Sequence, residues 1–305
     1  MKSLRGFLYA GAAVILACAI GGAVFWLRPV EVMHRIQYAR MALKGYQSRS
    51  VTVAGHRMHY DALGPETGEP VVLVHGLGAS AEDWVELAPW LGNAGYRVYM
   101  PDLFGYGRSD KPAGFSYSVP DEADAVVGFL DAMGLQQVNL GGWSMGGWVV
   151  QWIAIRHPER IHRLMLFDSA GLYVAPDWNT NLFMPSTAAE LNQLYALLIP
   201  NPQPIPGFVT ADLLRGSRRN AWIIRRALDS MLTGGYATDK LLPQLKMPVL
   251  IVWGALDRIT PPSEGEAMHR LIPQSQLQTF PGCGHLAPSG CAHQIGPVVL
   301  DFLKK

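Results

Sequence analysis

The stretch from Val138 to Gly147 constrains this chain most, because a short apolar segment runs directly into a serine between glycines, V-N-L-G-G-W-S-M-G-G. Residues 142–146 have the G-x-S-x-G spacing of a sharp strand-to-helix turn, which holds Ser144 in a strained backbone conformation. Small residues are needed where neighbouring backbone passes too close for a side chain. The next segment, Met145 to about Arg156, is apolar on nearly every face, so we expect a buried helix.

Continuous apolar runs of the kind found in buried parallel strands recur along the chain. They lie at residues 70–74, 96–100, 138–140, 163–167 and 248–253, with helix-length segments between most of them, and an alternating hairpin at 51–60 precedes them. This rhythm predicts an α/β fold with a mostly parallel sheet and helices on both faces, built from residues 51–170 and 241–305. In such sheets the ligand lies beyond the carboxyl ends of the strands.

About seventy residues interrupt the rhythm after the strand that ends near Asp168, which is too long for a simple loop. Residues 171–240 contain helix-length apolar segments on both sides of a proline-rich turn at 200–206. We therefore expect a mostly helical lid over the strand ends, apolar enough to line a pocket. Most of its apolar side chains are expected to pack against the core instead of facing a ligand.

The N-terminal residues 1–29 are predicted to be a membrane anchor. No residue from Phe7 to Leu27 is charged, a stretch long enough to cross a bilayer as a helix. A cleaved secretory signal, or a lipoprotein box that would lipidate Cys18, are the alternatives, but the apolar run continues well past Cys18. Residues 30–50 read as a basic, partly amphipathic helix lying on lipid headgroups, with a solvated linker helix as the alternative. The basic residues after the anchor outnumber those before it, which slightly favours a catalytic domain in the cytoplasm.

Composition excludes several classes of function. The formal net charge of +1 argues against a partner such as nucleic acid. The three cysteines, Cys18, Cys283 and Cys291, have no zinc-site spacing, so no metal is implied. Cys283 and Cys291 can form a disulfide if the domain is exported, whereas unpaired thiols are the commoner state for such a pair.

Ser144 needs a base to take its proton and a third group to orient that base. His285 lies in a Gly-rich turn after the last strand, and Asp257 lies on a loop after the strand at 248–253. The order Ser144, Asp257, His285 matches one of the known orders of serine triads. Asp168, which also follows a strand, is the alternative orienting acid.

Two further motifs follow early strands. His75 precedes Gly76 and is predicted to shape an oxyanion turn instead of acting as a base, and Asp102 lies in a Gly-rich turn where a structural role is expected. An oxyanion hole needs only backbone N–H groups. The predicted donors are Met145, directly after the nucleophile, and Leu77 in the turn after the early strand.

These motifs together resemble the α/β-hydrolase-fold serine hydrolases: H-G-L-G at 75–78, D-L-F-G-Y-G-R-S at 102–109, G-W-S-M-G-G at 142–147, W-G-A-L-D at 253–257 and G-H at 284–285. An anchor followed by such a domain is similar to the membrane-anchored monoacylglycerol lipase and carboxylesterase group. The resemblance implies hydrolysis of carboxylic esters, lipid-like ones among them, through an acyl-enzyme on Ser144 and without a cofactor. Many relatives carry a Glu and then a Pro shortly after the catalytic histidine, whereas this chain has Gly290-Cys291-Ala292. The resemblance therefore does not define how the last helix packs.

Other functions compete with ester hydrolysis. A carbon–carbon bond hydrolase of ring-cleavage products shares the Ser144-Met145-Gly146-Gly147 pattern, but its anionic substrates would need a lid arginine in the pocket, one of Arg215, Arg218, Arg219, Arg225 and Arg226. A solvated face is the simpler role for these arginines. A binding module with a dead site is disfavoured by the complete triad. Dehalogenases and epoxide hydrolases of the family place an aspartate where this chain has Ser144.

Overall fold

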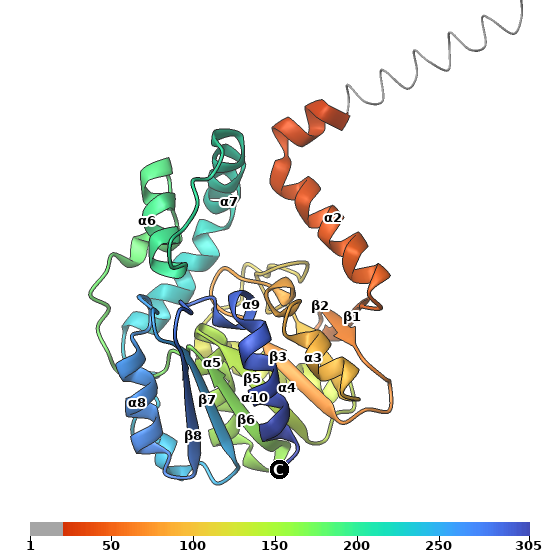
Figure 1. Cartoon of the computed structure of the whole chain (residues 1–305), viewed down its shortest axis with the longest axis vertical. Helices are drawn as coiled ribbons and strands as arrows, with labels where there is room; N and C mark the ends of the chain where they lie inside the picture. The colour runs from red at the N-terminus through yellow and green to blue at the C-terminus, as the bar shows by residue number, and fades with distance from the viewer. Residues whose placement is uncertain (1–20) are drawn as a thin grey trace, which may run out of the picture.

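A computed structural model describes residues 21–305, and its core is an eight-stranded sheet (Figure 1). The strand order is β1-β2-β4-β3-β5-β6-β7-β8. The strands are β1 (Gln47–Val53), β2 (His56–Leu63), β3 (Pro70–Val74), β4 (Arg97–Pro101), β5 (Val138–Trp143), β6 (Ile161–Phe167), β7 (Val249–Gly254) and β8 (Ser275–Phe280). The pairings β1–β2 and β2–β4 are antiparallel and all the others are parallel, which confirms the predicted mostly parallel sheet.

Helices cover both faces of the sheet, and a separate apolar core fills each side. One core packs α4 (Val119–Ala132), α5 (Met145–Arg156) and α8 (Pro262–Leu271) against the sheet, with Phe129, Trp148 and Met268 buried. The other packs α3 (Ala88–Asn93) and α10 (Ala292–Leu303), with Leu91 and Val299 buried. The strands β3 and β7 are apolar at every position, and β5 is apolar apart from Asn139, because both of their faces are covered.

The segment between β6 and β7 contains η3 (Thr180–Phe183), α6 (Ala188–Leu198), α7 (Gly207–Leu232) and η4 (Leu242–Gln244). Thr187 and Glu190 form a capping box that starts α6, because each side chain binds the other residue's backbone N–H. Proline residues separate α6 from α7, since a proline within a helix removes a backbone donor. Figure 1 shows α6 and α7 together above the sheet.

The N-terminal part differs in its boundaries from the sequence expectation. The helix α2 spans Pro29–Leu43 and the first strand already begins at Gln47, within the range 30–50 predicted as one linker helix. The side chains of Gln47 to Ser50 are polar and mostly exposed on an edge strand, so they lack an apolar strand pattern. Figure 1 shows α2 extending from β1 towards α7. There the backbone N–H of Val30 donates to Asp212 Oδ2 at 3.0 Å.

The predicted anchor lies mostly outside the described residues, as does Cys18. Within residues 21–305, no helix combines the length and the apolar composition that a bilayer crossing requires. The transmembrane helix therefore stays a prediction.

Two helices follow the last strand. Helix α9 (Ala287–Gly290) ends directly before Cys291, and α10 begins at Ala292 with Ile295 and Val299 buried against the sheet. The last helix is thus packed in spite of the unusual Gly290-Cys291-Ala292 sequence.

Candidate active site

Ser144 lies on the turn between β5 and α5 with φ 56° and ψ −122°, a conformation that L-residues rarely adopt. A side chain on Gly142 would approach the carbonyl oxygen of Gly146 to 2.2 Å, and one on Gly146 would approach that of Val74 to 2.3 Å. Both glycines are therefore fixed by close backbone contacts. The strained turn presents the Ser144 hydroxyl at the carboxyl end of the sheet.

The side chains of Ser144, His285 and Asp257 meet although they lie far apart in the sequence. His285 Nε2 lies 2.9 Å from Ser144 Oγ, and His285 Nδ1 lies 2.8 Å from Asp257 Oδ2. The carboxylate can only accept, so Nδ1 carries the proton and Nε2 accepts from the serine hydroxyl. The side chains of His285 and Asp257 are 1% and 0% exposed, which shields this chain of hydrogen bonds from water.

The Asp257 carboxylate is held by donors from its own loop. Its Oδ1 accepts from the backbone N–H groups of Ile259 and Thr260 at 2.8 and 3.0 Å, and Oδ2 accepts from Thr260 Oγ1 at 2.7 Å. Hydrogen bonds to an ionised acceptor are stronger than neutral ones. The loop therefore fixes one rotamer of Asp257, with Oδ2 aimed at the imidazole.

Asp168, the alternative orienting acid, does not contact His285 in the hydrogen-bond network. It is fully buried behind the site, where its Oδ1 accepts from the Gly254 backbone N–H at 2.7 Å. Burial and the nearby charge of Asp257 raise the pKa of Asp168 well above its usual value. The structure thus places Asp257, and not Asp168, next to the imidazole.

The loop that carries His285 is closed by a disulfide between Cys283 and Cys291. Of the two states left open by the sequence, the structure has the bonded one and not the unpaired thiols. Trp143 Nε1 also donates to the carbonyl oxygen of His285 at 2.7 Å. Hydrogen bonds to the backbone carbonyl of His285 and to its ring nitrogens therefore position the imidazole together.

The turn after β3 lies beside the nucleophile. His75 Nδ1 donates to the Gly76 carbonyl at 2.8 Å, and its Nε2 accepts from the Leu103 backbone N–H at 3.0 Å, so both ring nitrogens are used inside the fold. A side chain on Gly76 would come within 3.0 Å of Ser144 Cβ. Leu77 follows, and both Leu77 and Ser144 line the same pocket.

Met145 is the first residue of α5, where a backbone N–H has no partner within the helix. Together with the turn at Leu77, it lies next to the serine from which a tetrahedral intermediate would form.

Asp102 stabilises the adjoining loop. Its Oδ1 accepts from the Ala81 backbone N–H at 2.7 Å, and its Oδ2 accepts from the Arg108 backbone N–H at 2.9 Å. Oδ2 also lies 2.8 Å from His59 Nδ1. Asp102 therefore makes structural contacts and does not face the serine.

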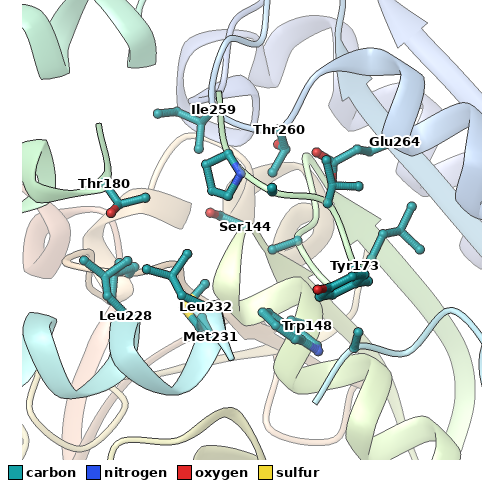
Figure 2. A pocket seen from close by; sticks show the side chains of 18 of the residues that line it. Ser144, Trp148, Tyr173, Thr180, Leu228, Met231, Leu232, Ile259, Thr260 and Glu264 are labelled. Carbon is teal, nitrogen blue, oxygen red and sulfur yellow. The ribbon is translucent and has the colours of Figure 1, made fainter. Parts of the chain in front are cut away.

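A pocket of about 460 Å³ opens above Ser144 between the core and the helical segment (Figure 2). Figure 2 shows Leu228, Met231 and Leu232 on one side of the serine and Thr260 and Glu264 on the other. Most of the lining is apolar, including Leu77, Trp148, Leu172, Val174, Trp178, Phe183 and Ile259. Among residues 21–305, no lysine, arginine or histidine lines this pocket.

Thr260 and Glu264 were not singled out in the sequence. Thr260 is recognisable afterwards as a hydroxyl three residues beyond Asp257 on the same loop. Glu264 lies in the first turn of α8, where acidic residues are ordinary, so nothing in the sequence shows that its side chain faces a pocket. The described residues contain no cluster of three or more potential metal ligands.

Comparisons with known proteins agree with this geometry. Lipase 1 of Psychrobacter immobilis is 29% identical over 262 residues, covering 82% of both chains. A 2-hydroxy-6-oxononadienedioate/2-hydroxy-6-oxononatrienedioate hydrolase of Pseudomonas putida is 30% identical, covering 81% of this chain and 92% of that one. The crystal structure of a membrane phospholipase A, a bacterial virulence factor, superposes with a TM-score of 0.83 at 26% identity and covers 98% of both chains. Residues 69–200 and 234–289, more than half of the chain, match the family described as alpha/beta hydrolase fold, and this chain belongs to that family.

Proposed function

We propose that this protein is a serine hydrolase that cleaves carboxylic esters of uncharged, lipid-like molecules such as monoacylglycerols. The observation that carries the proposal is the continuous contact from Ser144 through His285 to Asp257 at the floor of an apolar pocket. The similar lipases support the same reaction class.

The proposed reaction has two halves that use the same residues. Ser144 Oγ attacks the ester carbonyl while His285 Nε2 takes the hydroxyl proton, and the imidazolium then gives that proton to the leaving alcohol. Water next attacks the acyl-enzyme with His285 as base, which releases the acid and restores Ser144. Asp257 keeps Nδ1 protonated and stabilises the imidazolium that forms in each half.

The oxyanion of each tetrahedral intermediate needs donors in place before the reaction. The backbone N–H groups of Leu77 and Met145 are the proposed donors, because both residues adjoin the Ser144 side of the pocket. Each such donor typically contributes about 3 kcal/mol to the barrier reduction.

The pocket mouth supports a lipid-like substrate. Tyr173, Val174 and Leu232 line the pocket and are 74%, 50% and 48% exposed, so large apolar side chains of the pocket lining also face solvent.

A carbon–carbon bond hydrolase is the second candidate, because relatives with that activity are about 30% identical to this chain. Their dienoate substrates are anionic and call for a basic residue in the pocket. None of the five arginines of residues 171–240 is among the described residues that line the pocket, and three of them have partners elsewhere: Arg215 pairs with Asp212, Arg225 donates to Asn181, and Arg226 donates to the Ala113 carbonyl. The pocket chemistry therefore favours uncharged esters.

We also propose that residues 1–29 anchor the protein in a membrane and that α2 lies near the membrane surface. The similarity to a membrane phospholipase A over 98% of the chain supports this arrangement. The Cys283–Cys291 disulfide favours an oxidising compartment for the catalytic domain, opposite to the cytoplasmic side indicated by the charge count. Protease accessibility in intact spheroplasts compared with lysed ones tests the orientation, and protection in intact spheroplasts would contradict it.

Labelling with a fluorophosphonate and turnover of esters of increasing acyl length test the reaction class. The full chain should be labelled and should hydrolyse uncharged esters, whereas Ser144→Ala should lose labelling and about 10⁶-fold in kcat. Turnover of a dienoate and not of esters would replace the proposal with the second candidate.

A further inference from the structure

One polar side chain in the pocket has no partner and no role in the triad. Glu264 is 9% exposed and lines the pocket together with Ser144 (Figure 2). Within residues 21–305 its carboxylate takes part in no ion pair and no hydrogen bond, although its backbone N–H donates to the Pro261 carbonyl at 2.8 Å. Its oxygens keep some contact with solvent in the pocket, so a ligand that displaces this water must offer a hydrogen-bond donor or leave the carboxylate unpaired.

The charged side chains around Glu264 are acidic. Asp257 of the triad and Asp239 of the loop before η4 add negative charge near it, and Asp177 lies on the pocket wall. In the part of the chain that the structure describes, no basic side chain on the pocket wall offsets this negative charge. A hydroxyl group on a ligand would donate to the Glu264 carboxylate, whereas a carboxylate on a ligand would meet like charge in a poorly solvated space.

We infer that Glu264 is a specificity-determining residue that binds a hydroxyl group of the substrate and excludes substrates with an anionic group at that position. This inference rests on the proposed ester hydrolysis and narrows its substrate class to hydroxylated, uncharged esters. Partial glycerides have this chemistry, since they carry free hydroxyl groups beside the ester.

Protonation of Glu264 provides an independent readout. Burial, followed by the charges of Asp257 and Asp239, raises the pKa of Glu264 to about 7. A substrate carboxylate has a pKa of about 4 and stays ionised through this range. Exclusion of anionic esters should therefore be strong at pH 8 and weaker at pH 6, where Glu264 is mostly neutral.

The experiment compares two series of esters with the purified full chain. In the first, decanoate is esterified with glycerol, propanol or glyceric acid, which differ in hydroxyl and carboxylate content. In the second, the methyl ester of decanoic acid is compared with analogues that carry a hydroxyl or a carboxylate at the far end of the acyl chain. The series that responds identifies which half of the substrate reaches Glu264.

The variant Glu264→Gln keeps an acceptor oxygen but loses the charge, and Glu266→Gln is the matched control because Glu266 is exposed on the same helix. For the wild type at pH 8 we expect kcat/KM for the hydroxylated ester to exceed that for the anionic one by about 100-fold or more. Glu264→Gln should reduce this ratio at least about tenfold and abolish its change between pH 6 and 8, while Glu266→Gln behaves like the wild type.

The outcomes separate the two proposals. In one outcome, esters are hydrolysed in a Ser144-dependent way, but the ratio of kcat/KM for hydroxylated and anionic esters is equal in Glu264→Gln, Glu266→Gln and the wild type in both series. The assignment of Glu264 is then wrong, while the proposed ester hydrolysis is retained. If no ester in either series is hydrolysed, the proposed function fails and the assignment fails with it.

Discussion

The disulfide around His285 allows one prediction with a defined magnitude. Cys283 and Cys291 are eight residues apart, and their bond closes a loop that contains the imidazole and α9. Closing a loop of this length lowers the entropy of the unfolded chain enough to stabilise the fold by about 2.5 kcal/mol. Replacing both cysteines by alanine should therefore lower Tm by roughly 5 °C for a domain of this size.

Activity should respond less than stability to the same change. The His285 backbone still accepts from Trp143 Nε1, and its ring still binds Asp257, so two supports of the imidazole do not involve the disulfide. At 25 °C, kcat of the double variant should stay within about threefold of the wild type, less than about 1 kcal/mol in the barrier.

Thermal unfolding followed by tryptophan fluorescence measures the first effect, and initial rates on a short-chain ester measure the second. Mass spectrometry of the intact wild type, before and after alkylation under denaturing conditions, establishes that the disulfide is present. Cys283 and Cys291 are 1% and 8% exposed, so the native bond should resist reductant until the protein unfolds. An unchanged Tm in the alanine double variant of a protein shown to be oxidised would refute the loop-closure reasoning.

Three further changes test other parts of the structure. Asp257→Asn should lower kcat about 10⁴-fold, whereas Asp168→Asn should lower it less than about tenfold, and equal losses in ester turnover would contradict the assigned roles. Gly146→Ala should destabilise the fold by about 3 kcal/mol in urea unfolding because of the Val74 and His75 carbonyls, while Gly216→Ala, with open space in α7, should stabilise it by about 0.5–1 kcal/mol. Burial raises the pKa of Glu122 well above its usual value, so the folded state keeps a proton that the unfolded state loses above about pH 4.5. The free energy of unfolding therefore falls as the pH rises, by up to about 1.4 kcal/mol per pH unit. Glu122→Gln should remove that part of the pH slope between pH 5 and 8, and an identical slope in variant and wild type would show that Glu122 titrates normally.

The sheet was predictable because its central strands carry their own signal. A strand buried on both faces is almost wholly apolar, as β3 and β7 are at every position and β5 is apart from Asn139, and such runs are visible without any knowledge of neighbours. The edge strand β1 has no such signal, because the side chains of Gln47 to Ser50 are polar and mostly exposed. The sequence therefore predicts the start of this strand at Val51, four residues after its observed start at Gln47.

The candidate site also has some features that the sequence predicts and others that it does not. Ser144, Asp257 and His285 each follow a strand, so chain order alone brings them to one edge of a parallel sheet. The state of Cys283 and Cys291 and the direction of the Glu264 side chain depend on how separate segments pack. Neither has a pattern in the local sequence, because both depend on how the segments after β7 and β8 pack against residues that are distant in the chain.

The pocket wall, more than the triad, bears on which of the two substrate classes this chain accepts. Lipases and carbon–carbon bond hydrolases resemble it to almost the same degree, so neither the fold nor the nucleophile separates an ester from a dienoate. The two substrate classes differ in charge, and a pocket selects charge through the few side chains that face it. Here the ionisable residues on the wall are acidic or phenolic, and the lid arginines with defined partners bind outside the pocket. An anionic substrate would therefore lose its hydration without gaining a counter-ion, whereas an uncharged ester loses little on entering and gains apolar contacts around Ser144.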